Sequence, residues 1–143
     1  MGGSSGGGIS TIDLTKIASA ANDRLKEAFS KERKVLFVCG LDERDHFDGV
    51  IIRTEALRGI QYEVLSDPAE ATEAKIDDFN VIVGLVHNST NHAAINTAIQ
   101  LAVGKRKNCL FVRSSDQSPM PQYVLQFRIR CLSWAEFVDL IRA

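Results

Sequence analysis

The apolar residues from residue 34 onward fall into five short runs, separated by segments with helical spacing. Lys34 to Gly40 (KVLFVCG) and Val81 to Val86 (VIVGLV) are almost entirely apolar, which is typical of strands buried on both faces of a sheet. The other three runs are Ile60 to Leu65, Cys109 to Val112 and Phe127 to Leu132. Strands that alternate with helices are parallel, because the chain must cross back over the sheet between them. We therefore predict a three-layer α/β fold, Rossmann-like or flavodoxin-like, with five parallel strands in the order 2-1-3-4-5.

The segments between the runs carry apolar residues at three- and four-residue spacing, the pattern of a helix with one buried face. After the first strand, Phe47, Val50, Ile51 and Leu57 form such a stripe, and Gly59 is expected to end the helix. The other predicted helices run from Asp67 to near Ile76, from about Ile95 to Gly104, and onward from Ser133 and Glu136, which have capping-box spacing.

The first 33 residues differ in pattern from the rest. Residues 1–8 (MGGSSGGG) have the composition of an added flexible linker, and we assign them no function. Within residues 9–33, apolar residues recur at helical spacing from Thr11 to Lys31, which predicts an extra N-terminal amphipathic helix. Two uses of its apolar face stay open: packing on the flank of the α/β domain at residues 34–143, or pairing with a second chain.

Charge and cysteine content exclude several broad classes. The 143 residues contain 17 Lys and Arg against 18 Asp and Glu, so there is no excess of positive charge to bind a nucleic acid. The apolar runs are far shorter than the roughly 20 residues that span a bilayer, so we expect no membrane partner. All three cysteines lie inside apolar runs, which suits buried, reduced thiols and predicts a cytoplasmic protein.

The predicted fold also indicates where a ligand would bind. In open α/β sheets this is beyond the carboxyl ends of the strands, where the strand order reverses, here between strands one and three. The loops after strands one, three and four reach this point. The residues that we expect to bind a ligand there are Gly40, Leu41, His87, Asn88, Ser89, Thr90, Asn91, His92, Arg113, Ser114 and Ser115.

The loop after the third strand carries the strongest signal. Six polar residues, 87–92, lead into a helix N-terminus, where backbone N–H groups favour an anion or a carbonyl oxygen. One of residues 89–91 would serve equally well as the N-cap of this helix. His92 lies three positions before Ile95, so its ring should face the sheet, either toward a ligand or in a hydrogen bond at the edge of the core. No Cys or carboxylate accompanies the two histidines of this loop at ligand spacing, so no metal site is expected.

Two familiar catalytic patterns are excluded. A phosphatase loop needs five residues between its nucleophilic Cys and its Arg, whereas four separate Cys39 from Arg44. The carboxylates of Asp42, Glu43 and Asp45 would also repel a phosphate in this loop. Neither a GxGxxG sequence after the first strand nor a GxxxxGK[ST] sequence occurs, which argues against the usual dinucleotide and P-loop sites.

Two segments resemble TIR and TIR-like nucleotide-binding domains: Lys34-Val-Leu-Phe-Val-Cys-Gly-Leu-Asp-Glu-Arg44, and Met120-Pro-Gln-Tyr ahead of the last strand. Val83 to Lys105 is similar to the related nucleoside deoxyribosyltransferases, with Ala102-Val-Gly-Lys105 in place of their ALGK sequence. The resemblance extends over residues 34–143 and implies a TIR-like α/β domain.

Such families use a Glu on the helix after the third strand, at the ribose C1′ atom. Counting back from Lys105 puts that position near Asn96, and no acidic residue occurs between Phe79 and Asp116. Since an Asn side chain cannot act as a carboxylate nucleophile, the resemblance implies a domain that has lost the glycosidic chemistry.

A second resemblance is to a family of small bacterial domains with no assigned activity. In that family an apolar strand leads to Asn-His at a helix start, then to a Lys-rich turn, a strand and Arg-Ser. Val81 to Ser115 follows this order, with Asn91-His92, Lys105-Arg-Lys107 and Arg113-Ser114 in place. This likeness points to the same loops and implies no activity.

The expected function is therefore that of a non-catalytic domain which senses a nucleotide-type ligand or drives assembly, within a larger bacterial signalling or defence protein. NAD or a nucleotide-derived molecule is the expected ligand class, with no resident cofactor; a second copy or other domains of the protein are the expected macromolecular partners. One alternative is an NAD or nucleoside hydrolase that uses Asp42, Glu43 or His92. The other is a purely homo-oligomerising module.

Overall fold

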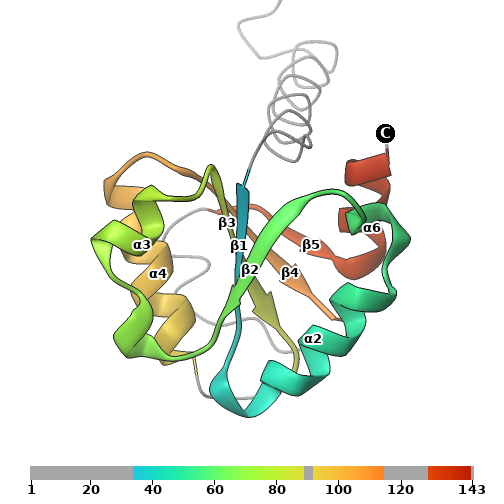
Figure 1. Cartoon of the computed structure of the whole chain (residues 1–143), viewed down its shortest axis with the longest axis horizontal. Helices are drawn as coiled ribbons and strands as arrows, with labels where there is room; N and C mark the ends of the chain where they lie inside the picture. The colour runs from blue at the N-terminus through green and yellow to red at the C-terminus, as the bar shows by residue number, and fades with distance from the viewer. Residues whose placement is uncertain (1–33, 89–91, 115–128, 143) are drawn as a thin grey trace, which may run out of the picture.

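The computed structural model of the chain describes residues 34–88, 92–114 and 129–142. Within these ranges it contains a five-stranded, all-parallel sheet in the order β2-β1-β3-β4-β5 (Figure 1). The strands are β1 (Lys34–Val38), β2 (Gln61–Leu65), β3 (Val81–Val86), β4 (Asn108–Arg113) and β5 (Cys131–Ser133). The predicted fold class and strand order are confirmed. The linker and helix predicted for residues 1–33 lie outside the described residues.

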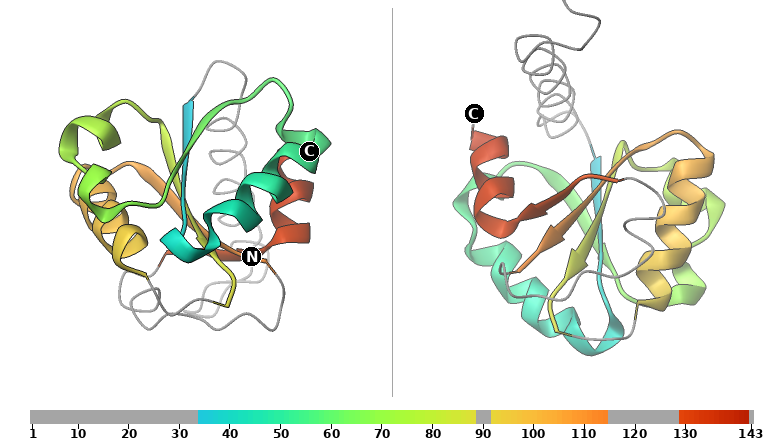
Figure 2. Two further views of the ribbon diagram at one scale, coloured as in Figure 1. Left: turned by 60° about the horizontal axis from the view of Figure 1, so that its bottom comes forward. Right: turned by 180° about the vertical axis from the view of Figure 1, so that it is seen from behind.

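Helices cover both faces of the sheet, which gives the three layers. α2 (Arg44–Arg53) and α6 (Trp134–Arg142) lie on one face, and α3 (Glu73–Asp77) and α4 (Ala93–Gly104) lie on the other (Figures 1 and 2). Three short 3₁₀ turns complete the connections: η1 (Leu41–Glu43), η2 (Glu55–Leu57) and η3 (Pro68–Glu70). None of the helices in the described ranges is long and apolar enough to cross a membrane.

The two central strands are buried as their apolar sequences predict. All six residues of β3 are buried, and Val35 to Val38 of β1 are 0% exposed. Gly84 sits in the middle of β3 because there is no room there for a side chain. A Cβ atom at this position would lie 2.9 Å from two atoms of the Phe111 ring and 3.0 Å from Ile95 Cγ2.

Helix α6 begins where the sequence predicts. The Ser133 N–H donates to Glu136 Oε1 over 2.9 Å, and the Glu136 N–H donates to Ser133 Oγ over 3.2 Å. These reciprocal bonds form a capping box, so this prediction is confirmed. The same two bonds lower the pKa of Glu136.

Three elements differ from the prediction. The helix predicted from Asp67 to near Ile76 is instead the turn η3 followed by a separate helix, α3, because the N-cap residue Thr72 is extended. Helix α2 ends at Arg53 rather than at Gly59, because Thr54 takes an extended conformation; Gly59, at φ 84°, instead follows the short turn η2 that buries Leu57. The last strand is Cys131–Ser133 rather than Phe127 to Leu132. Of the earlier positions, 127 and 128 lie outside the described residues, and 129 and 130 are not in a strand.

Candidate functional site

The loops after β1, β3 and β4 meet at the carboxyl end of the sheet. The strand order reverses between β1 and β3, so the loop with Gly40 and the loop with His87 leave from neighbouring strands in opposite directions across the sheet. Ser114 follows β4, and its N–H donates to the Val86 carbonyl over 2.8 Å. This is the position at which open α/β sheets bind their ligands.

A buried carboxylate joins the first two of these loops. Glu43 is only 8% exposed, and its Oε2 atom accepts a hydrogen bond from the Asn88 N–H over 2.8 Å. The Glu43 N–H in turn donates to the Gly40 carbonyl over 3.0 Å. Because the carboxylate holds the backbone of the β3 loop, the observed role of Glu43 is to position that loop.

Two stacked imidazoles connect α2 to the loops after β3 and β4. The rings of His46 and His87 lie 4.2 Å apart between centroids, with an angle of 13° between their planes. His87 Nδ1 is also hydrogen-bonded to Ser114 Oγ, which follows β4. We call His46, His87 and Ser114 the histidine cluster.

The side chain of Asn88 adds a second polar partner for the His87 ring. Its Nδ2 atom lies 3.3 Å from His87 Nε2. Both ring nitrogens of His87 therefore have a hydrogen-bonding partner, Ser114 Oγ at Nδ1 and the Asn88 amide at Nε2, and the tautomer of His87 decides which atoms donate. The cluster presents these polar groups at the carboxyl end of the sheet.

The environment of His46 favours its neutral form. Burial lowers the pKa of His46, the neighbouring His87 lowers it further, Glu43 raises it and Arg53 lowers it. A neutral ring is the form that stacks on His87 without electrostatic repulsion.

Cys39 lies between the end of β1 and the first loop, and its thiol is not ionised at neutral pH. It is 0% exposed, and burial raises its pKa to about 12, although Arg44 acts in the opposite direction. At neutral pH it is a thiol, whereas the nucleophile of a phosphatase must be a thiolate. Cys109 and Cys131 are also reduced, but they are half-buried and not fully buried as expected.

The N-terminus of α4 differs in detail from the prediction. The helix begins at Ala93, and His92 is the N-cap residue, with no side-chain hydrogen bond to the first turn. None of Ser89, Thr90 and Asn91 is therefore the N-cap, and these three residues lie outside the described part of the chain. His92 is half-buried, with its Nε2 atom inside the protein.

The remaining predicted site residues are dispersed. Leu41 is 61% exposed beside the first loop, and Asp42 is exposed next to it. Arg113 ends β4 and interacts with Cys131 and Glu136, on the β5 side of the site. Ser115 lies outside the described residues.

Asn96 was considered above as the position of a lost carboxylate. It lies on the second turn of α4, and its Oδ1 atom accepts a hydrogen bond from Gln100 Nε2 over 3.0 Å. This bond runs along the outside of the helix. No group of three or more His, Cys, Asp and Glu side chains within the described ranges could hold a metal ion.

Three residues of this region were missed by sequence reasoning. His46 was missed because its stacking on His87 joins residues that are far apart in the sequence. Arg44 and Ser66 were missed because their contact is long-range: Arg44 Nη1 donates to Ser66 Oγ over 3.3 Å, and Ser66 follows the edge strand β2. Arg44 also pairs with Asp48 over 3.2 Å.

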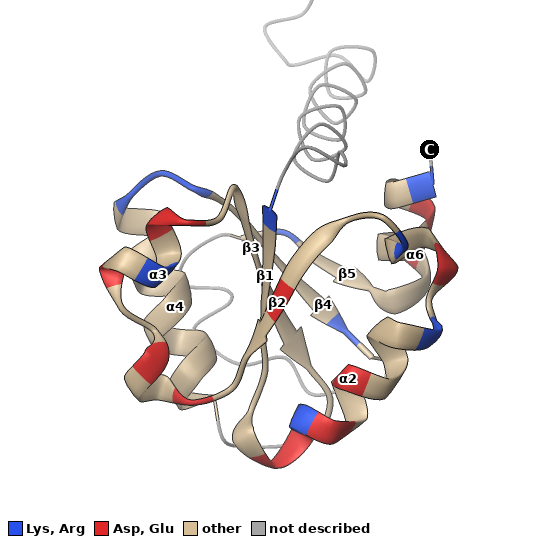
Figure 3. Ribbon diagram, viewed as in Figure 1, with Lys and Arg blue, Asp and Glu red and all other residues tan. Residues whose placement is uncertain are grey.

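Acidic residues outnumber basic ones around η1 and the start of α2, although Arg44 lies among them, and the basic turn at the amino end of β4 lies beside the acidic Asp77 (Figure 3). The carboxyl end carries the acidic residues of η1 and the start of α2, and the amino end carries the basic turn between α4 and β4. Within the basic turn, Lys105 Nζ pairs with Asp77 over 3.0 Å. The residues concerned are Asp42, Glu43, Asp45 and Asp48 at the first end, and Lys105, Arg106 and Lys107 at the second.

The fold and site define a parallel α/β domain with a polar cluster at its switch point. A comparison with models of known protein families finds no match to this sequence. A comparison with curated proteins finds no match either.

Proposed function

We propose that the domain binds a small nucleotide-type ligand at the carboxyl ends of β1, β3 and β4, and that it acts as a ligand-sensing module without glycosidic chemistry. The observation that carries this proposal is the hydrogen bond from the Asn88 N–H to Glu43. It holds two loops of the switch point together, and the histidine cluster adds the third loop. Such a surface is organised before any ligand arrives, which lowers the entropic cost of binding.

The ligand class follows from the resemblance to TIR-like nucleotide-binding domains, which extends through the same loops. NAD, ADP-ribose and cyclic nucleotides are the members of this class to test first. In the same proposal, the domain is part of a larger signalling or defence protein. Ligand binding would change the activity of its other domains or its assembly.

The non-catalytic part of the proposal rests on the carboxylates. Glu43 is only 8% exposed, and its Oε2 atom accepts a hydrogen bond from the β3 loop, so this carboxylate serves to position the loop. The helix after β3 has an amide, Asn96, near the place where the resembling enzymes carry a Glu. An amide cannot form the covalent or ion-pair intermediate of a glycosidase.

Thermal unfolding in the presence of NAD, ADP-ribose, AMP and cyclic AMP tests the binding. A ligand at 100 times its Kd adds about 2.7 kcal/mol of stability, which raises Tm by several degrees in a domain of this size. Ser114→Ala should weaken the effect. Thr97→Ala is the matched control, because the Thr97 hydroxyl donates to the Ala93 carbonyl of its own helix. If none of these ligands raises Tm, the proposed function is wrong.

The hydrolase alternative has its own measurement. Wild-type protein incubated with NAD should release no nicotinamide above the background of a Glu43→Gln preparation. Turnover that the wild type shows and the variant lacks would overturn the non-catalytic proposal.

A further inference from the structure

Strand β2 is one edge of the sheet, and its outer backbone groups face away from β1. The Cys39 N–H donates to the Leu65 carbonyl over 3.0 Å, so the polar groups of Leu65 point toward β1. Backbone groups alternate along a strand, so those of Tyr62 and Val64 point outward. No strand in the described ranges lies beyond β2, so within these ranges no strand pairs with the two outward N–H and two outward C=O groups.

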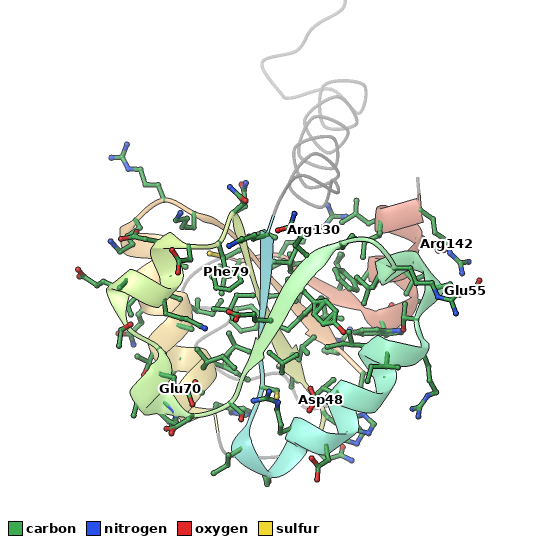
Figure 4. All side chains as sticks on the ribbon, viewed as in Figure 1. Asp48, Glu55, Glu70, Phe79, Arg130 and Arg142 are labelled. Atoms are coloured by element: carbon green, nitrogen blue, oxygen red, sulfur yellow. The ribbon has the colours of Figure 1, made fainter. Side chains whose placement is uncertain are left out.

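The helices on either side leave this edge accessible. Cavities of about 510 Å³ and 310 Å³ flank β2 and share Tyr62, Glu63 and Lys75. Figure 4 shows Asp48, which lines the larger cavity, on the α2 side of β2, and Phe79, which lines the smaller one, on the α3 side.

An exposed apolar side chain lies beside the same edge. A third cavity, of about 280 Å³, is lined by both Ile52 and Tyr62. Ile52 lies near the end of α2 and is 71% exposed, more than any other large apolar side chain that is described. A strand added to β2 would remove part of this surface from water, which favours association.

The sequence of β2 is complementary to itself in an antiparallel pair. With a two-fold axis at Glu63, the middle of the five-residue strand, Tyr62 of one copy lies opposite Val64 of the other. These are the residues with outward N–H and C=O groups, so each such pair exchanges two hydrogen bonds. Aromatic and β-branched side chains opposite each other also stabilise antiparallel pairs.

The two-fold axis brings Glu63 opposite its own copy, and two bare carboxylates would repel. Each carboxylate is already paired, because Lys75 Nζ of α3 lies 2.7 Å from Glu63 Oε2. Two Glu63–Lys75 ion pairs therefore face each other across the axis, rather than two unpaired carboxylates. This charge complementarity favours a second copy of the chain over an unrelated acidic or basic segment.

We propose that β2 is a homodimer interface, at which two copies pair antiparallel about Glu63 and their sheets become continuous. This interface is separate from the ligand site at the carboxyl end of the sheet.

Cysteine cross-linking tests the register. In the proposed pair the two copies of residue 63 form a non-hydrogen-bonded pair with Cα atoms about 4.5 Å apart, within disulfide range. Glu63→Cys should therefore give a disulfide-linked dimer under mild oxidation. Gln61→Cys is the matched control, because its two copies would lie about 13 Å apart along the strands. Equal cross-linking of both variants, or of neither, overturns the proposal.

Sedimentation over a concentration series tests the contacts in the protein without added cysteines. The wild type should dimerise, and Val64→Pro should weaken the dimer about tenfold or more, because it removes one outward N–H from each copy. Lys75→Gln should weaken it as well, since the Glu63 carboxylates then face each other unneutralised, whereas Arg106→Gln should not. Circular dichroism confirms that each variant is folded. A monomeric wild type, or variants that leave the dimer unchanged, contradicts the interface.

Discussion

The Glu43 carboxylate accepts a hydrogen bond from the Asn88 N–H over 2.8 Å, and so connects loops that are 45 residues apart in the sequence. The contact lies where the strand order reverses, and it holds the loop after β3 against η1, which follows β1. Any ligand at the switch point would meet a surface whose shape depends on this bond.

Glu43→Ala should therefore destabilise the domain by about 1.5 kcal/mol, the lower range for a hydrogen bond to a charged group. Glu43→Gln keeps an acceptor oxygen and should lose less than half as much. Urea unfolding measures both values, with Asp42→Ala as an exposed control that should change stability by about 0.5 kcal/mol or less. If the Gln and Ala variants lose equal stability, the hydrogen bond is not what Glu43 contributes.

The stack of His46 on His87 predicts a pH dependence. The pKa of His46 is lowered in the folded protein, so the unfolded chain binds more protons as pH falls below about 6.5. The stability from the neutral ring is thus complete above that pH, and is lost as pH falls through the folded-state pKa. His46→Phe keeps a ring for stacking but cannot titrate.

Unfolding free energies at about pH 7.5 and pH 5.5 measure this effect. The wild type should lose more stability between the two values than His46→Phe does. A larger loss in the variant would mean that protonation of His46 does not oppose folding.

The capping box of α6 gives a third prediction. Ser133→Ala removes the acceptor for the Glu136 N–H and should destabilise the domain by about 1 kcal/mol. The pKa of Glu136 is lowered in the folded state, so this carboxylate stabilises the domain above about pH 4.5, and the contribution is lost as pH falls through the lowered value. Ser133→Thr, which keeps the hydroxyl, should restore most of the stability in the same unfolding experiment.

Gly84 should not accept a larger side chain. The Cβ atom of Gly84→Ala would press on the Phe111 ring, and we expect a loss of about 1–3 kcal/mol from overpacking. Gly104→Ala is the matched control: no atom lies within 4 Å of the new Cβ, and Ala favours the helix by up to about 1 kcal/mol. In thermal unfolding we expect Gly84→Ala to lower Tm and Gly104→Ala to raise it. A stabilised Gly84→Ala variant would mean that the core at Phe111 adapts at no cost.

Much of the fold could be predicted from the sequence because the signals are local. Two apolar runs gave the central strands, and the spacing of Ser133 and Glu136 located the start of α6. The end of α2 was misplaced, since the stripe continues to Leu57 even though a 3₁₀ turn, not the helix, carries that residue into the core. The last strand was misplaced because the pairing with β4, a tertiary contact, begins only at Cys131.

The candidate site was only partly predictable for the same reason. The loops could be assigned from the strand order, but the contacts that join them could not. Nothing in the local sequence shows that Glu43, rather than Asp42 or Asp45, accepts the hydrogen bond from the Asn88 N–H. That depends on the path of the β3 loop. The stacking of His46 on His87 likewise depends on how α2 crosses the sheet.

Around η1 and the start of α2, the four acidic side chains of Asp42, Glu43, Asp45 and Asp48 outnumber the one basic side chain, that of Arg44, so the potential at this part of the candidate site is negative. An anionic ligand would approach this site against a repulsive potential, and added salt would screen that repulsion. The association rate of such a ligand should therefore rise with ionic strength, whereas most anion-binding proteins associate more slowly in salt. The same field would favour the cationic nicotinamide ring of NAD over its neutral, reduced form at the mouth of the site.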